Sequence, residues 1–210
     1  MHNGFFVTGT DTNVGKTVLS SLLCAALPAT YWKPIQTGAR EGMDRHTVMT
    51  WAGIKKDACC PETYVFDDPV SPHLAAQRAG REIALEEIKV PRLNSAMPLI
   101  VEGAGGVLVP INRHQFMIDL MRHLGFPVIL AARSTLGTIN HTLLSLKCLQ
   151  DSGILIWGVV LIGPENPENR EAIEHYGETR VIGHIPMLHE INCTSLRNVF
   201  ATCFAQKVFP

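Results

Sequence analysis

The sequence predicts an α/β fold, with a mainly parallel central sheet and helices on both faces. Short apolar runs recur along the chain, and most are separated by a segment with helical periodicity, which is typical of parallel α/β units. The later runs are apolar throughout instead of alternating, as expected of strands that are buried on both faces. A glycine-containing loop directly follows the first run, at the strand end where ligands of such sheets bind.

The apolar runs define the expected strands in chain order. They are GFFVTG (4–9), TYWKP (30–34), PLIVEG (98–103), FPVILAA (126–132) and ILIWGVVLI (154–162). A chain of 210 residues is long enough for one substantial core, and it contains no internal repeat or low-complexity segment. We therefore expect a single domain over residues 1–210.

Helices are expected between these strands. The first follows the glycine-containing loop as VLSSLLCAAL (18–27), and another helix start is expected near Asp44. The segment SPHLAAQRA (71–79) offers Ser71 as N-cap and Pro72 at the first helical position, and TINHTLLSLKCLQDSG (138–153) ends at a glycine. The stretch 80–96 has no clear assignment, and Pro91 must interrupt any helix there.

Composition limits the classes of partner. Charged residues make up 18% of the chain and the net charge is -1, so nothing indicates attraction to nucleic acid or anionic lipid, and small or neutral partners are expected. The longest apolar stretch, residues 154–163, is half of the roughly 20 residues that a membrane span needs, and the N-terminus lacks a basic region and cleavage site. A cytoplasmic protein is expected. The six cysteines include no C-x-x-C pair and are expected to be reduced and without metal.

The loop GTDTNVGKT (9–17) is the strongest functional signal. Its two glycines before the lysine are one residue further apart than in the usual phosphate-binding loop, so Thr10 stands where the first glycine is expected. A strand precedes it and a helix follows, a context that aims backbone N–H groups at a phosphate and predicts a P-loop NTPase-like architecture. Lys16 can then reach the β- and γ-phosphates, and Thr17 can ligate magnesium. The alternative is a glycine-containing turn with an incidental Gly-Lys-Thr.

A magnesium site also needs carboxylates, because Mg²⁺ typically takes one or two of them alongside phosphate oxygens. Glu102 is expected to end the strand PLIV and to open EGAGG, where Gly103, Gly105 and Gly106 would let backbone approach a nucleotide closely. Asp44 lies in GMDRHTV, at a helix start. Taken singly, each carboxylate is more often a cap or a solvated charge.

Together these pieces resemble the dethiobiotin synthetase family, whose phosphate loop has the same extra residue. The further blocks that fit the family pattern are KPIQTG (33–38), SPH (71–73), VEGAGG (101–106), LGTINHTLL (136–144) and GHIPML (183–188). They occur in the family's order, and the resemblance runs from residue 5 to about residue 190.

The resemblance implies a ligase of biotin biosynthesis. Such an enzyme adds carbon dioxide to one amine of 7,8-diaminononanoate, phosphorylates the carbamate with ATP, and closes the ureido ring with the second amine. ATP is a substrate and Mg²⁺ the implied cofactor. Both the carbamate and the phosphoryl group are anionic, so lysines and magnesium suit the reaction.

The family pattern also implies roles for individual residues. Lys33, Lys16 and Thr12 would be catalytic, with Lys33 the key cation; Thr12 and Thr37 would face the diamine and its carbamate; and Thr17, Asp44 and Glu102 would hold magnesium. The nucleotide would contact Asn13, Val14, Gly15, Lys16, Thr17, Val18, Asp44, Glu102, Gly103, Ala104, Gly105, Ile162, Gly163, Pro186, Met187 and Leu188.

A further anion site is implied at the start of the helix after residue 136. Gly137, Thr138, Ile139 and Asn140 open that helix, and its free N–H groups could receive the substrate's carboxylate. In the family this site comes from the partner subunit, which implies a homodimer with shared active sites. His141 has no assigned role, and His73 is expected to be structural.

The sequence departs from the family pattern at the position expected to contact the nucleotide base. Ile162 stands where an asparagine commonly contacts the adenine edge, so adenine selection must rest on backbone groups near Ile162, Gly163 and the PML turn, or be loose. Cys193 aligns with an acidic residue of some relatives, and Asn13 replaces a glutamate found in some members.

Two other classes of protein are alternatives to a ligase. A nucleotide-driven switch or partitioning ATPase shares the fold, but it usually carries a second lysine early in the loop, where this chain has Thr10 and Asp11. A small-molecule kinase would be expected to clamp the phosphoryl group with arginine-rich segments, and no such cluster is evident.

Overall fold

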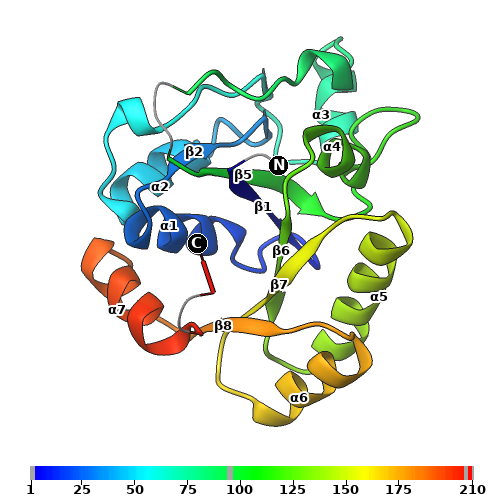
Figure 1. Cartoon of the computed structure of the whole chain (residues 1–210). Helices are drawn as coiled ribbons and strands as arrows, with labels where there is room; N and C mark the ends of the chain where they lie inside the picture. The colour runs from blue at the N-terminus through cyan, green and yellow to red at the C-terminus, as the bar shows by residue number, and fades with distance from the viewer. Residues whose placement is uncertain (1–2, 94–96, 206–207, 210) are drawn as a thin grey trace.

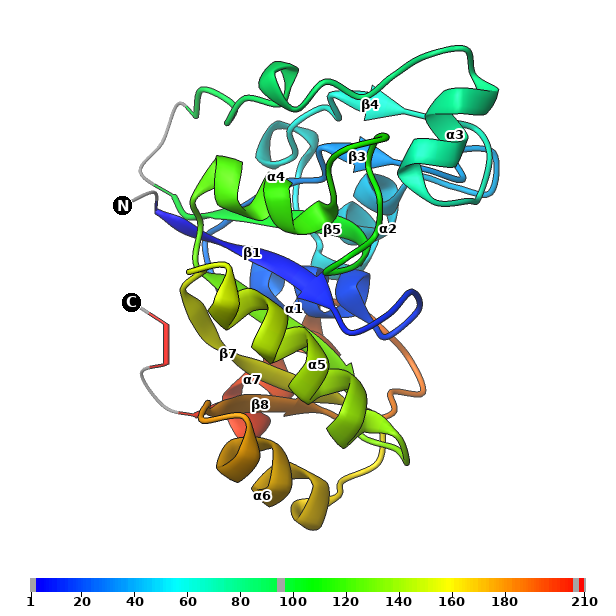
Figure 2. The same cartoon turned by 90° about the vertical axis from the view of Figure 1, so that its right-hand side faces the viewer.

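The computed structural model describes residues 3–93, 97–205 and 208–209. Its centre is a six-stranded sheet in the order β2-β5-β1-β6-β7-β8, in which every neighbouring pair runs parallel (Figures 1 and 2). The strands are β1 (Gly4–Gly9), β2 (Thr30–Trp32), β5 (Leu99–Gly106), β6 (Val128–Arg133), β7 (Ile156–Ile162) and β8 (Val181–Ile185). The predicted fold class is therefore confirmed.

Helices cover both faces of this sheet, as Figure 1 shows with α1 and α7 on one side and α5 and α6 on the other. The first layer is α1 (Lys16–Ala26), α2 (Asp44–Ala52) and α7 (Cys193–Cys203), and the second is α4 (Met117–Leu124), α5 (Thr138–Asp151) and α6 (Pro167–Tyr176). Because successive side chains of a strand point to opposite faces, Val101 packs into one core and Ile100 into the other. Burial on both faces explains the continuous apolar runs.

A smaller unit lies beside β5 and contributes one wall of the site. It contains a two-stranded parallel sheet of β3 (Ile35–Gln36) and β4 (Tyr64–Val65) and the helix α3 (Pro72–Arg78). Two single-turn 3₁₀ helices, η1 (Lys56–Ala58) and η2 (Leu85–Glu87), complete it. Of the unassigned stretch 80–96, only η2 is regular, and residues 94–96 lie outside the described residues. Ile83 and Ile88 anchor this stretch to the core.

The five predicted strands and the predicted helices are present, with two corrections in detail. The strand containing Glu102 does not end there but continues to Gly106. A Cβ on Gly103 would lie 2.8 Å from Cε1 of Phe6, so the missing side chain serves close packing of β5 on β1. Ser71 does precede α3, with Pro72 at its first position, but its hydroxyl contacts Nδ1 of His73 instead of capping the helix.

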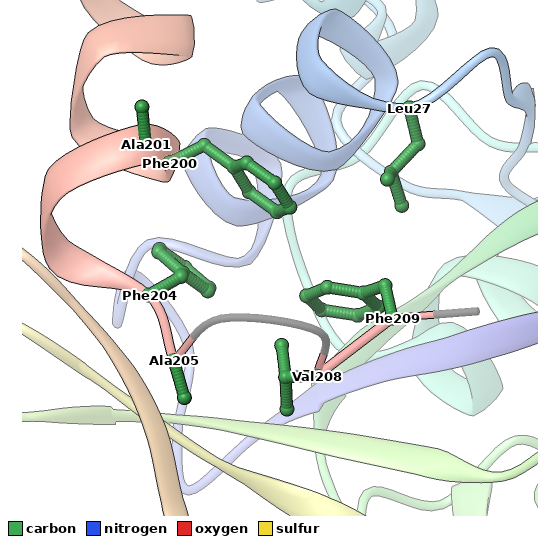
Figure 3. A pocket seen from close by; sticks show the side chains of 7 residues that line it. All are labelled: Leu27, Phe200, Ala201, Phe204, Ala205, Val208 and Phe209. Carbon is green, nitrogen blue, oxygen red and sulfur yellow. The ribbon is translucent and has the colours of Figure 1, made fainter.

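The C-terminal stretch closes the face that carries α1 and α7. Figure 3 shows Phe200, Phe204 and Phe209 around an apolar pocket of about 270 Å³, and the ring of Phe209 also meets Phe5 of β1 at 5.3 Å. The described residues that line this pocket carry no titratable side chain. Among the described residues, no helix is both long enough and apolar enough to cross a membrane.

Candidate active site

The predicted phosphate loop joins β1 to α1 at the carboxyl edge of the sheet. Gly15 precedes α1 with φ of 100°, a left-handed conformation, and a Cβ there would lie 2.7 Å from Cδ1 of Ile162. Asn13 also has positive φ, at 56°. No side chain caps the first turn of α1, so its N–H groups are available to an anion.

Lys16 lies at the start of α1 and is almost fully buried. Its Nζ donates a hydrogen bond to the carbonyl oxygen of Asp11, 2.9 Å away, which holds the side chain across the loop. Burial lowers the pKa of Lys16 to about 8, and the nearby charge of Lys33 adds to this effect against the opposing charges of Glu102 and Asp44. A bound phosphate would add negative charge beside Lys16 and so stabilise its protonated form.

Glu102 is the centre of the site. It lies within β5, beside Val7 of β1, and its side chain is fully buried. Its Oε1 accepts a hydrogen bond from Thr17 Oγ1 at 2.8 Å and one from Lys33 Nζ at 3.3 Å, and its Oε2 accepts one from Tyr31 OH at 3.1 Å. A carboxylate is tolerated in a buried strand only with such partners.

Lys33 joins this carboxylate to a second one. Its Nζ lies 2.5 Å from Oδ2 of Asp44, at the start of α2. Burial alone would lower the pKa of Lys33, but the charges of Glu102 and Asp44 outweigh it and raise the pKa above its usual value. The ammonium group therefore stays protonated.

Gln36 of β3 fixes the position of Asp44. Met43, the N-cap residue of α2, has no side chain that can accept a hydrogen bond, and Oε1 of Gln36 accepts one from the backbone N–H of Asp44 at 3.1 Å instead. The second carboxylate is thus held by the small sheet.

The four charged residues expected to form the site line one cavity of about 970 Å³. They come from α1, from the segment after β2, from α2 and from β5, which the fold brings to one edge of the sheet. Predicted residues that line this cavity are Thr12, Asn13, Gly15, Lys16, Thr17, Val18, Lys33, Thr37, Asp44, Glu102, Ala104 and Gly105.

The remaining predicted residues lie outside the cavity lining. Gly103 packs on Phe6, as described above, and Val14 is buried beneath the loop. Others occupy the ends of neighbouring elements: Ile162 and Gly163 close β7, Pro186, Met187 and Leu188 follow β8, and Gly137, Thr138, Ile139 and Asn140 open α5. Of these, Ile162 reaches the phosphate loop through its contact with Gly15.

Sequence reasoning missed three residues that hold the site. Tyr31 and Gln36 flank Lys33 in the chain, and their contacts with Glu102 and Asp44 are described above. Arg133, at the end of β6, donates from Nη2 to the carbonyl oxygen of Thr12 at 3.2 Å. The sequence pattern could have indicated Tyr31. In an extended chain, side chains two residues apart point to the same side, so Tyr31 is expected on the same side as Lys33.

The donors around Glu102 fit magnesium. Thr17 Oγ1 and Glu102 Oε1 lie 2.8 Å apart, close to the roughly 2.9 Å between adjacent ligands of an octahedral Mg²⁺ ion with bonds of about 2.0–2.1 Å. Lys33 Nζ contacts both Asp44 and Glu102, so the two carboxylate groups lie close to each other on either side of this ammonium group. Within the described part of the chain, no cluster of three or more His, Cys, Asp or Glu side chains is arranged to hold a metal, so nucleotide phosphates would complete the set.

Comparisons with known proteins identify the family. The family described as "AAA domain" matches residues 3–195. ATP-dependent dethiobiotin synthetase BioD of Rhodopseudomonas palustris strain TIE-1 is 41% identical over 97% of this chain and 95% of its own length. The chain belongs to the dethiobiotin synthetase family. BioD of Brucella ovis is 42% identical over the same shares of both chains.

Family membership confirms the resemblance carried by the phosphate loop and the later blocks, and with it the ligase class. The partitioning-ATPase alternative is not favoured. The cell division ATPase MinD of Pyrococcus furiosus aligns with a TM-score of 0.53 at 14% identity, over 88% of this chain and 83% of its own, and this likeness shows the fold alone.

Replacing the buried cation should destabilise the empty protein. In Lys33→Met, Glu102 and Asp44 lose their shared counter-charge, and we expect a loss of about 3 kcal/mol in the free energy of unfolding. Lys147→Met is the matched control, because Lys147 pairs with Asp151 at 2.6 Å on the exposed surface and should cost less than about 1 kcal/mol. Urea unfolding without nucleotide or metal measures the free energy of unfolding of both variants. Equal losses would show that the buried ion pairs of Lys33 stabilise the protein no more than an exposed ion pair does.

Proposed function

We propose that the protein converts 7,8-diaminononanoate, carbon dioxide and ATP to dethiobiotin, ADP and phosphate. The observation that carries this proposal is the grouping of two ammonium groups and two carboxylates around one cavity beside a phosphate loop. Three anionic groups must meet in this reaction: the carbamate, the transferred phosphoryl group and the remaining diphosphate. A desolvated site with fixed cations stabilises that charge far better than water does.

The phosphate side of the cavity would bind the nucleotide. The N–H groups from Asn13 to Val18, at the start of α1, would bind the phosphates, and Lys16 would reach the β- and γ-phosphates. Thr17, Asp44 and Glu102 would hold magnesium, which would neutralise part of the phosphate charge. This assignment is supported by the short distance between Thr17 and Glu102.

The same cavity would bind the diamine next to the nucleotide phosphates. Lys33 is the catalytic cation that would face the carbamate, and Thr12 and Thr37 also line the cavity. Because Lys33 is fixed by Asp44 and Glu102, its charge is in position before the carbamate is phosphorylated.

The substrate's carboxylate would be received by residues 137–140 of a second subunit in a homodimer. Gly137 precedes α5 in the left-handed conformation, and the N–H of Thr138 donates to the carbonyl oxygen of Thr135 at 3.1 Å. No side chain caps the helix, so the N–H groups of Ile139 and Asn140 would receive the carboxylate. Leu136 is fully exposed and Leu144 mostly so, which supports an apolar interface at this helix. We further infer that residues 1–210 form one domain and that the homodimer works in the cytoplasm.

Carbon incorporation is the direct test of the reaction. Labelled carbon dioxide should enter an acid-stable product only when diamine, magnesium and nucleoside triphosphate are all present, because the ring closes through a phosphorylated carbamate. Scintillation counting with each component omitted in turn measures this. Triphosphate hydrolysis that continues without diamine and fixes no carbon would instead support a nucleotide-driven switch.

Base selection should be weak. The side chain of Ile162 packs on Gly15 and cannot hydrogen-bond a base, so discrimination rests on backbone groups near Gly163 and Pro186–Leu188. A site with polar side chains can reject a wrong partner by about 10⁴-fold, whereas apolar contacts give about 10- to 200-fold. We expect kcat/KM for ATP, GTP and CTP to lie within about 200-fold of one another, and a preference of 10³-fold or more for ATP would contradict this.

A further inference from the structure

Tyr31 has no role in the proposed chemistry, yet it contacts the central carboxylate. It lies in β2, next to β5, and its side chain is fully buried. Its hydroxyl group donates a hydrogen bond to Oε2 of Glu102 at 3.1 Å. Burial raises the pKa of Tyr31 well above its usual value, so this hydroxyl group remains a donor.

The two oxygens of Glu102 have different partners. Oε1 faces the cavity side, where Thr17 and Lys33 contact it, and Oε2 faces Tyr31. The terminal torsion of a glutamate is broad, so the side chain itself does not decide the angle at which the carboxylate plane meets the metal position. An external donor on Oε2 restricts that rotation.

The ring that carries this donor is fixed by its backbone. Tyr31 is in register with Ile100 of β5 on one side, and on the other side its carbonyl oxygen accepts a hydrogen bond from Cys60 N–H at 2.8 Å. Tyr31 is therefore held between two segments, and Glu102 lies two residues after Ile100 on the same face of β5. Because the ring is also fully buried in the core, the hydroxyl group has little room to move away from Glu102.

We propose that Tyr31 is a positioning residue that orients Glu102 for magnesium and the nucleotide. It holds Oε2 so that Oε1 stays beside Thr17, where the two oxygens can act as adjacent metal ligands. This inference rests on the proposed magnesium site. Hydrogen-bond partners of metal ligands typically change metal affinity by about 10- to 100-fold when they are removed.

The test compares Tyr31→Phe with Tyr64→Phe in the full-length protein. Both changes remove one hydroxyl group and keep the ring. Tyr64, in the small sheet, is the control because its ring is also buried and its hydroxyl group also bonds a glutamate, Glu87 of η2 at 2.5 Å. That hydroxyl group is part-buried and also accepts a hydrogen bond from the N–H of Ala84 at 3.0 Å. Calorimetric titration with a non-hydrolysable ATP analogue, with and without Mg²⁺, gives the gain in affinity that the metal provides. Thermal melts report folding.

In the parent protein and in Tyr64→Phe, Mg²⁺ should strengthen analogue binding by the same factor. In Tyr31→Phe that factor should fall about tenfold, while affinity without metal stays unchanged. An unchanged factor in Tyr31→Phe, equal losses with and without metal, or loss of folding would assign Tyr31 a structural role and overturn the inference. No gain from Mg²⁺ in the parent protein would instead overturn the proposed magnesium site.

Discussion

A carboxylate buried within a parallel strand constrains the whole site. Glu102 lies in β5, where its neighbours are apolar, and it is stable there because Thr17, Lys33 and Tyr31 all donate hydrogen bonds to it. Those three residues come from α1, from the segment after β2 and from β2 itself. Satisfying one buried charge therefore brings together the phosphate loop, the substrate-facing lysine and the edge of the sheet.

The same requirement explains why the site is already assembled without ligands. Lys33 is held by Glu102 and Asp44, and Asp44 is held in turn by Gln36, so the charges have little freedom to rearrange. Preorganised charge costs no reorganisation when the anionic reactants arrive. Burial lowers the pKa of Lys16 despite the nearby charges of Glu102 and Asp44, so a bound phosphate would further stabilise its protonated form.

Much of the fold and of the site could be predicted from the sequence, because the phosphate loop and the strands β1, β2, β5, β6 and β7 carry local signals. Residues 16, 33, 44 and 102 were expected together and line one cavity. Elements with weak local signals were missed: only Ile173 of α6 is buried, so that helix lacks an apolar face, and β8 is a short strand before the PML turn. Tyr31 was missed because its partner is 71 residues away in the chain.

The central claim is that the negative charge of Glu102, more than its shape, organises catalysis. Glu102→Gln keeps the size of the side chain and removes the charge that faces Lys33 and the metal position. Its one amide oxygen can accept a hydrogen bond from Thr17 or from Tyr31, and the hydroxyl group that faces the amide nitrogen would accept a hydrogen bond instead of donating one. Turnover of this variant, measured by labelled carbon dioxide incorporation at saturating substrates, is the most direct test. We expect a fall of about a hundredfold or more in a folded protein. Turnover within about threefold of the parent protein would contradict the account.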